Sequence, residues 1–210
     1  MKTVAAILLA AGRSRRMGAF KPLLPFGDTT IVEACIDNLR AGGVEELIVV
    51  VGHRAEELRT RLAHVPSLSF ALNDEVESEM GASIARGVER VSADVKTVLV
   101  ALADYPAVPP FVIRKLIDEH ERTGALLVVP EWQGRGGHPV LVDMRFREAL
   151  LNLDSRGGLR ALFDAHRGDA LLRRVPVDSP YVTRDADTWE DYCALHEEVF
   201  GRRPPDAPRQ

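Results

Sequence analysis

The first 27 residues constrain this chain more than any other stretch. Residues 3–10 form a short apolar run, and a loop punctuated by Gly12 and Gly18 follows it. An apolar run that ends near a glycine is typical of a buried strand in a parallel sheet. The first acidic residue of the chain is Asp28, and before it stand only cations among the charged side chains: Lys2, Arg13, Arg15, Arg16 and Lys21. We therefore expect an anion-binding loop at the carboxyl end of the first strand.

Phosphate is the anion that this loop suits best. Glycine lets a backbone approach a ligand and present its N–H groups, arginine forks match phosphate oxygens, and lysine adds a point charge. Two better-known phosphate loops do not fit the spacing. A Walker loop needs a lysine directly after its second glycine, where Ala19 follows Gly18, and a dinucleotide fingerprint needs a glycine in place of Ser14. On charge alone, a solvated basic surface loop remains the alternative.

The composition is that of one globular domain. The chain has 210 residues, 46% hydrophobic and 28% charged, with a formal net charge of −4. That balance argues against a nucleic-acid binder, and no apolar run reaches the roughly 20 residues that a membrane span needs. We expect one domain over residues 1–200, a disordered tail over residues 201–210 and, because the start lacks a secretory pattern, a cytoplasmic location. Cys35 and Cys193 lie in helix-like apolar patterns and are expected to be buried thiols.

Strand-like and helix-like segments alternate along the whole chain, which predicts an α/β fold with a mostly parallel sheet covered on both faces. Strands are expected over residues 46–51, 68–72, 95–103, 125–130 and, at an edge, 170–177. Open α/β sheets bind ligands at the carboxyl ends of their strands. Polar side chains at those ends are therefore site candidates, and Asn73 and Asp104 are the two that stand there.

Asp104 ends the most apolar of these strands. A lone carboxylate at the end of a buried strand is costly unless it faces a cation or hydrogen-bond donors. Since Mg²⁺ prefers carboxylate and phosphate oxygens, Asp104 is a candidate magnesium ligand. A helix cap is the alternative, because a helix is expected to begin a few residues later, near Pro109.

Residues 9–18 read Leu-Ala-Ala-Gly-Arg-Ser-Arg-Arg-Met-Gly and are followed by Lys21-Pro22-Leu23-Leu24. This stretch resembles the signature of the nucleotidyltransferases related to the molybdenum-cofactor guanylyl- and cytidylyltransferases. The form Ala10-Ala11-Gly12 resembles the cytidylyl branch. The resemblance covers about residues 3–200 and implies a three-layer, Rossmann-like nucleotidyltransferase fold.

The resemblance implies Mg²⁺-dependent transfer of CMP from CTP to a phosphate-bearing acceptor, molybdopterin, with release of pyrophosphate. A molybdenum hydroxylase is the partner it suggests. The catalytic roles fall on Arg16, Lys21 and Asp104. The nucleotide-binding roles fall on Leu9, Ala10, Ala11, Gly12, Arg13, Lys21, Asn73, Gly81 and Ser83.

Residues 185–191 resemble a late acidic segment of the same family, with Ala186 and Trp189 as departures. The resemblance implies that Asp187, or else Asp185, completes the metal site with Asp104. Thr188 and Asp191 also have the spacing of a capping box. Acceptor contacts are implied for Arg135, His138 and Gly157, for each of which a purely structural role stays open.

Two other functions remain open on the sequence alone. One is a nucleotidyltransferase for a sugar phosphate or another small phosphate, since the same scaffold serves other acceptors. The other is a non-catalytic nucleotide-binding partner of a molybdenum enzyme. The acidic residues Asp104, Asp185 and Asp187 disfavour that partner, because a pure binder need not keep a metal site. The preferred base, the acceptor and the oligomeric state are not fixed by the residues.

Overall fold

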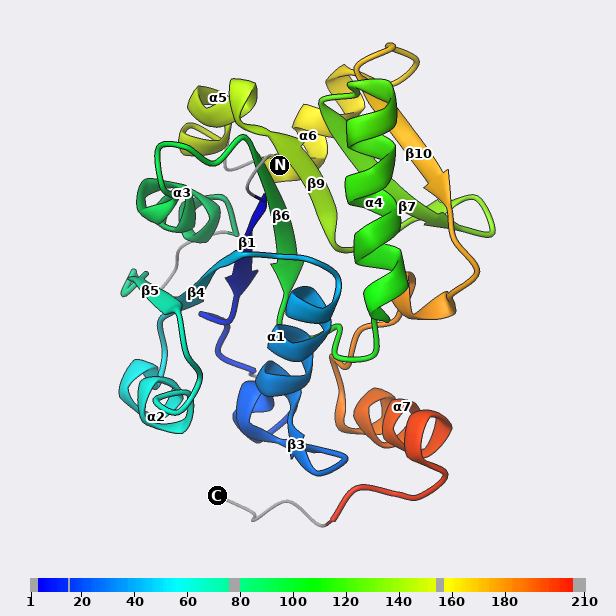
Figure 1. The fold of residues 1–210 in the computed structure, drawn as a ribbon. Coiled ribbons are helices and arrows are strands. Elements are labelled where there is room, and N and C mark those ends of the chain that lie inside the picture. The colour runs from blue at the N-terminus through cyan, green and yellow to red at the C-terminus, as the bar shows by residue number, and fades with distance from the viewer. Residues whose placement is uncertain (1–3, 15, 76–79, 154–156, 206–210) are drawn as a thin grey trace.

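A computed structural model describes residues 4–14, 16–75, 80–153 and 157–205, and the structural statements below concern these ranges. Within them one large sheet forms the centre of the molecule (Figure 1). Its strands are β1 (Val4–Leu9), β4 (Glu46–Val51), β5 (Leu68–Leu72), β6 (Thr97–Leu102), β7 (Leu127–Trp132), β8 (Arg135–Gly136), β9 (Val140–Asp143) and β10 (Leu172–Pro176). Their order is β10-β7-β9-β6-β1-β4-β5, and β8 pairs with β7.

The sheet is mostly parallel, as predicted. Strands β6, β1, β4 and β5 run in one direction, with Ile7 opposite Ile48 and Val100 on its two sides. Two strands are exceptions: β9 lies antiparallel between β6 and β7, and the short β8 pairs antiparallel with β7. A parallel return needs a crossover of about a dozen residues or more, and the chain between Trp132 and Val140 is too short for one.

Helices cover both faces of the sheet, which gives three layers (Figure 1). One face packs against α1 (Ile31–Ala41), α2 (Ala55–Arg61) and α4 (Pro110–Thr123), and the other against α3 (Met80–Arg90), α5 (Arg147–Leu151) and α6 (Gly158–Ala165). Ala6 and Leu8 of β1 face the first set of helices, and Ala5 and Ile7 face the second. Burial on both faces explains why this strand is apolar at successive positions.

A smaller apolar cluster ties the end of the chain to its beginning. It joins a hairpin of β2 (Pro25–Phe26) and β3 (Thr29–Thr30), which the sequence pattern did not predict, to the last helix, α7 (Trp189–Phe200). Tyr192 of α7 is fully buried, and its hydroxyl donates to the Pro25 carbonyl at 2.5 Å. The packing holds the start of α7 beside the basic loop. Three short 3₁₀ helices complete the described structure: η1 (Lys21–Leu23), η2 (Met144–Phe146) and η3 (Pro180–Thr183).

The strands predicted over residues 46–51 and 68–72 have those bounds in the structure, and β10 lies at an edge as expected. Cys35 is buried, whereas the prediction for Cys193 is wrong, because that thiol lies only half-buried on α7 at the margin of the small cluster. Residues 206–210 of the expected tail lie outside the described residues. Among the helices that are described, none is long and apolar enough to cross a bilayer.

The predicted capping box at α7 is confirmed. The Thr188 hydroxyl accepts from the Asp191 backbone N–H, and the Asp191 carboxylate accepts from the Thr188 N–H, both at 3.1 Å. Replacing Thr188 with alanine is expected to lower the free energy of unfolding by about 1 kcal/mol, because one end of the box is lost. Urea denaturation measures this difference, and Thr188→Ser, which keeps the hydroxyl, is the control. An unchanged midpoint in Thr188→Ala would contradict the assignment.

Candidate active site

A cavity of about 680 Å³ opens where β1, β4, β5 and β6 end. Its volume is in the range of sites for small ligands. Most residues predicted to bind nucleotide or metal line it: Leu9, Ala10, Ala11, Gly12, Arg13, Arg16, Lys21, Asn73, Ser83, Asp104 and Asp187. The structure therefore brings these predicted positions together around one cavity, and their roles in binding stay predictions.

The basic loop leaves β1 and turns back toward the sheet through Ser14. Ser14 has a positive φ of 52°, and its hydroxyl accepts from the Lys21 backbone N–H at 3.1 Å. Pro22 then fixes the first turn of η1. The turn directs the Lys21 side chain inward, where it is only 11% exposed, while the Arg16 side chain is 74% exposed. Arg15 lies outside the described residues.

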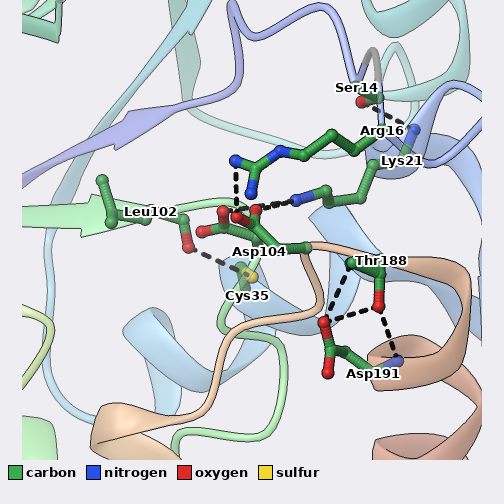
Figure 2. Close-up of polar contacts among 9 residues, drawn as sticks. Ser14, Arg16, Lys21, Cys35, Leu102, Asp104, Thr188 and Asp191 are labelled. Atoms are coloured by element: carbon green, nitrogen blue, oxygen red, sulfur yellow. Dashed lines mark hydrogen bonds and ion pairs between the residues drawn. The ribbon is translucent and has the colours of Figure 1, made fainter.

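Two cations of this loop meet two acids from distant parts of the chain. The Lys21 ammonium lies 2.8 Å from Asp187 Oδ1 and 3.4 Å from Asp104 Oδ2. The Arg16 guanidinium lies 2.8 Å from Asp187 Oδ2. Figure 2 shows Arg16 and Lys21 both reaching toward Asp104 from the same side. The alternative in which Asp104 caps a helix is not what the structure shows, since the residue that precedes α4 at its N-terminus is Pro109.

Asp185 joins these acids to form an acidic triad with Asp104 and Asp187. Each offers a carboxylate oxygen, and these oxygens lie within 4.8 Å of one another. The segment is fixed by Ala186, which is fully buried and donates its backbone N–H to the Asp104 carbonyl at 2.9 Å. This bond holds Ala186 next to the end of β6, so that Asp185 and Asp187, which flank it, both lie near Asp104.

The charges of the acidic triad affect one another. Burial, with help from the nearby Asp187 charge, raises the pKa of Asp104, although Lys21 opposes the shift. Burial and the charges of Asp187 and Asp104 also raise the pKa of Asp185. At Asp187 the hydrogen bond from Lys21 outweighs the effect of burial and lowers the pKa of the carboxyl. Crowded carboxylates of this kind gain stability from a further cation.

The acidic triad has the donors that a divalent ion needs. Its ligands are hard carboxylate oxygens, which Mg²⁺ and Mn²⁺ prefer. Asp104 Oδ1 is buried and has no hydrogen-bond partner among the described residues, so at least one oxygen is available. The residues present therefore fit a divalent metal.

Asn73 and Ser83 form another part of the cavity wall. The Asn73 amide donates to the Ser83 hydroxyl at 2.8 Å, and the Asn73 backbone N–H donates to the Val51 carbonyl. The chain at the end of β4 passes so close that a Cβ on Gly52 would lie 2.6 Å from the Asn73 carbonyl oxygen. A side chain at position 52 would therefore force the wall apart.

Several residues in the cavity wall were missed by the sequence analysis: Ser14, Pro22, Gly52, His53, Asp74, Glu75, Met80, Leu102 and Ala103. His53 carries the most chemistry among them. Its exposed ring packs edge-on against Phe20, with 6.0 Å between the ring centroids. Its position directly after a strand and a glycine is the signal that could have found it, because Asp104 occupies the corresponding position after β6.

Besides Asp185, which belongs to the acidic triad, four predicted site residues do not line the cavity among the described residues. Gly81 lies on α3, where a Cβ would point toward Leu153. Gly157 directly precedes α6 and lies against Ala161. Arg135 is exposed on the short strand β8. His138 lines a separate, small cavity with Tyr105 and Cys35. The predicted roles of these four in binding stay predictions. Residues 154–156 and the acidic positions 77 and 79 lie outside the described residues.

His138 predicts a measurable pH effect. Burial lowers the pKa of its ring to about 4. Between about pH 6.5 and pH 4 the unfolded chain therefore binds a proton that the folded protein excludes, and folding becomes less favourable as the pH falls. Between pH 7 and pH 4.5, we expect the free energy of unfolding to fall by about 2 kcal/mol more in the wild type than in His138→Asn.

Urea denaturation of both proteins at the two pH values measures this effect. The free energy of unfolding of each protein at pH 7 serves as its own reference. The pH-independent stability that the substitution costs through lost packing then drops out of the comparison. Equal pH dependence in the two proteins would show that the ring is protonated at its ordinary pKa in the folded state.

Comparison with known proteins decides the family. The model of the MobA-like NTP transferase domain matches residues 6–173. This chain belongs to the MobA-like NTP transferase family. The family is one of nucleotidyltransferases, and the fold and the position of the cavity agree with that membership.

Relatives in the family carry different names. The chain is 31% identical to nicotine blue oxidoreductase of Paenarthrobacter nicotinovorans, over 91% of this chain and 96% of that protein. It is 27% identical to the molybdenum cofactor cytidylyltransferase of Escherichia coli, over 94% and 97%. It is 32% identical to the bifunctional protein GlmU of Geobacter metallireducens over 61% of this chain, but it spans only 27% of the length of GlmU.

Solved structures match the chain along nearly its whole length. The structure of Rv0371c from Mycobacterium tuberculosis superimposes with a TM-score of 0.81 at 30% identity, covering 93% of this chain and 98% of that one. A second structure of Rv0371c is a complex with manganese, at a TM-score of 0.78 and 28% identity over 93% and 98% of the two chains. A nucleotidyl transferase from Methanothermobacter matches at 0.81 and 26%, over 96% and 99%. A protein similar to this chain thus binds a divalent metal, as the acidic triad is equipped to do.

Proposed function

We propose that this protein is a Mg²⁺-dependent cytidylyltransferase that transfers CMP from CTP to a phosphate-bearing acceptor, molybdopterin. The observation that carries the proposal is the meeting of Lys21 and Arg16 with Asp104 and Asp187 inside the cavity. The choice of CTP and molybdopterin has two supports. One is the Ala10-Ala11-Gly12 form of the loop, and the other is the similarity to the Escherichia coli enzyme along nearly the whole chain.

In this proposal the triphosphate of CTP lies along the basic loop, where Gly12 has open space beside it and Arg13 lines the cavity. Asn73 and Ser83 contact the nucleoside. Lys21 and Arg16 neutralise the charge that develops on the leaving pyrophosphate, which is where a fixed cation lowers the barrier most. Asp104, Asp187 and Asp185 hold Mg²⁺, which when bound supplies Lewis-acid stabilisation of phosphate charge.

The transfer step needs no strong general base. An oxygen of the acceptor phosphate attacks the α-phosphorus of CTP in line, the new P–O bond forms, and the bond to the β-phosphate oxygen breaks. Pyrophosphate leaves with that electron pair. Because a phosphate oxygen is already ionised near neutral pH, the protein contributes mainly by positioning and by charge neutralisation.

We place the acceptor next to Asp185, on the side of Arg135 and His138. Burial raises the pKa of Tyr105, the charges of Asp185 and Asp104 raise it further, and Arg135 opposes the shift. These interactions indicate that Arg135 and the acids are close enough to act on the same phenol. The rings of Tyr105 and His138 pack on this side with 5.3 Å between their centroids and a tilt of 56° between their planes. Arg135 would bind the acceptor phosphate, and Gly157 would contribute backbone donors.

An oxidoreductase is the second candidate, because nicotine blue oxidoreductase aligns over nearly the whole chain. Such a function would use the basic loop to hold the pyrophosphate of a dinucleotide. Transfer to another small phosphate, or binding without turnover, would use the same cavity. The acidic triad favours the nucleotidyltransferase, because hydride transfer does not require a metal site beside the phosphates.

Ligand-dependent thermal stability separates these functions. Each of CTP, GTP, ATP and UTP with Mg²⁺, and NADH and NADPH without it, is added to the wild type. A ligand at about 100 times its dissociation constant adds about 2.7 kcal/mol of stability. A shift for CTP alone supports the proposal, a shift for another triphosphate changes the base, and a shift for NADH or NADPH alone favours the oxidoreductase.

Turnover is then measured with radiolabelled CTP and molybdopterin. We expect labelled product and pyrophosphate in equal amounts. Binding of CTP with no product from molybdopterin or from sugar phosphates would favour a non-catalytic nucleotide-binding protein.

A further inference from the structure

We infer that Lys21 is an internal counter-ion of the metal site, so that the acidic triad takes up a divalent cation well only when a nucleotide draws Lys21 away. The inference rests on the proposed function for the nucleotide, and on the geometry of the described residues for the competition between Lys21 and the metal. It assigns Lys21 a positioning role in addition to its contact with phosphate.

Three carboxylate oxygens of the acidic triad already have cationic partners. Lys21 forms ion pairs with Asp187 Oδ1 and Asp104 Oδ2, and Arg16 forms one with Asp187 Oδ2. Only 11% of the Lys21 side chain is exposed, so its ammonium is held among the acids rather than in solvent. A metal that binds Asp104 and Asp187 through these oxygens must therefore displace the ammonium or be repelled by it.

The charges set the direction of the effect. Three carboxylates carry −3, and Lys21 and Arg16 together return +2, so the cluster presents a net charge of −1 to an approaching ion. Two like charges a few ångströms apart repel strongly in a partly buried site. A nucleoside triphosphate offers both cations other partners, and their transfer to phosphate restores the full charge of the acidic triad.

Lys21 can change partners without a change in the fold. Its backbone is fixed by Ser14 on one side and by Pro22 on the other. A lysine side chain is flexible, and its ammonium donates in three directions. By linkage, if the nucleotide raises the affinity for metal, the metal raises the affinity for nucleotide by the same factor. The site therefore favours arrival of the two ligands together.

Binding of Mn²⁺ to the nucleotide-free protein tests this inference. Electron paramagnetic resonance of free Mn²⁺ gives the dissociation constant for the wild type, Lys21→Met, Lys21→Gln and Lys96→Met. We expect Lys21→Met and Lys21→Gln to bind Mn²⁺ about tenfold more tightly than the wild type, because the competing charge is gone. Lys96→Met is the control. It removes an exposed cation just before β6, at the opposite end of that strand from Asp104, so its affinity should equal that of the wild type.

Equal or weaker Mn²⁺ binding by both Lys21 variants would overturn the inference. If neither variant folds, as judged by circular dichroism, Arg16→Gln replaces them. It should bind Mn²⁺ more tightly than the wild type by a smaller factor, and no change there would also overturn the inference. Asp104→Asn should lose the binding, and retention would place the ion elsewhere and overturn the inference as well.

This experiment separates the inference from the proposed function. Tighter Mn²⁺ binding by Lys21→Met together with no transfer of CMP by the wild type would leave the inference standing and remove the function. Transfer of CMP by the wild type together with unchanged Mn²⁺ affinity in Lys21→Met would support the proposed function and overturn the inference.

Discussion

Asp104→Asn is expected to lower the rate of nucleotidyl transfer by about a thousandfold or more while the protein stays folded. The substitution keeps the shape of the side chain and removes the negative charge on which a divalent ion depends. Metal ions contribute several kcal/mol to such reactions, and each 1.4 kcal/mol corresponds to about a tenfold change in rate. Because Asp104 lies at the end of β6, two residues beyond its last member, the sheet itself should be unaffected.

The measurement is turnover with CTP, Mg²⁺ and molybdopterin at saturating concentrations, together with thermal unfolding. Asp94→Asn is the control, because Asp94 is an exposed acid in the turn before β6, at the opposite end of that strand from Asp104. It should keep the turnover of the wild type. Near-normal turnover in Asp104→Asn with an unchanged unfolding curve would mean that Asp104 does not hold the metal.

Gly137→Ala is expected to be the most destabilising small substitution near the site. A Cβ at this position would lie 2.0 Å from the Val182 carbonyl oxygen, which is backbone and cannot rotate away. The same carbonyl accepts from the His138 N–H at 2.8 Å, so the clash would also break this bond. Overpacking of this kind costs about 3 kcal/mol, equivalent to a fall in Tm of roughly 6–12 °C for a chain of this size.

Gly136→Ala, one residue earlier at the end of β8, is the matched control. The nearest atoms to a Cβ there belong to side chains, Val129 at 3.3 Å and Arg174 at 3.6 Å. Thermal unfolding should therefore show a small change for Gly136→Ala and a large one for Gly137→Ala. Similar Tm values for the two variants would mean that β8 and η3 can separate at little cost. The result matters for the site, because η3 leads directly into the segment of Asp185 and Asp187.

The parts of the fold that could be predicted are those that the local pattern determines. Residues 46–51 and 68–72 are strands because apolar or alternating residues run between polar and glycine positions, and that signal is complete in the sequence. The direction of β9 could not be predicted, since an apolar run has no direction. The β2–β3 hairpin was missed because each of its strands has only two residues, too few for a period.

The site shows the same division. Arg16, Lys21 and Asp104 could be assigned from their positions at the ends of strands and from the resemblance to a family. The pairing of Lys21 with Asp187 could not be, because these residues lie 166 positions apart and meet only through the packing of α7. His53 was missed because its position two residues beyond β4 is its one signal, and no motif surrounds it. The burial of His138 depends on Val182 and Tyr105, neither of which its own sequence neighbourhood reveals.

The hydrogen bond from Ala186 to the Asp104 carbonyl also bears on how the protein folds. One member of the acidic triad ends a central strand, and the other two stand between the last strand and the last helix. During synthesis, Asp104 therefore leaves the ribosome long before its two partners. Contacts between segments distant in sequence form late, since closing the intervening chain is costly. Uptake of a metal during refolding would therefore report the docking of α7, after the sheet has already formed.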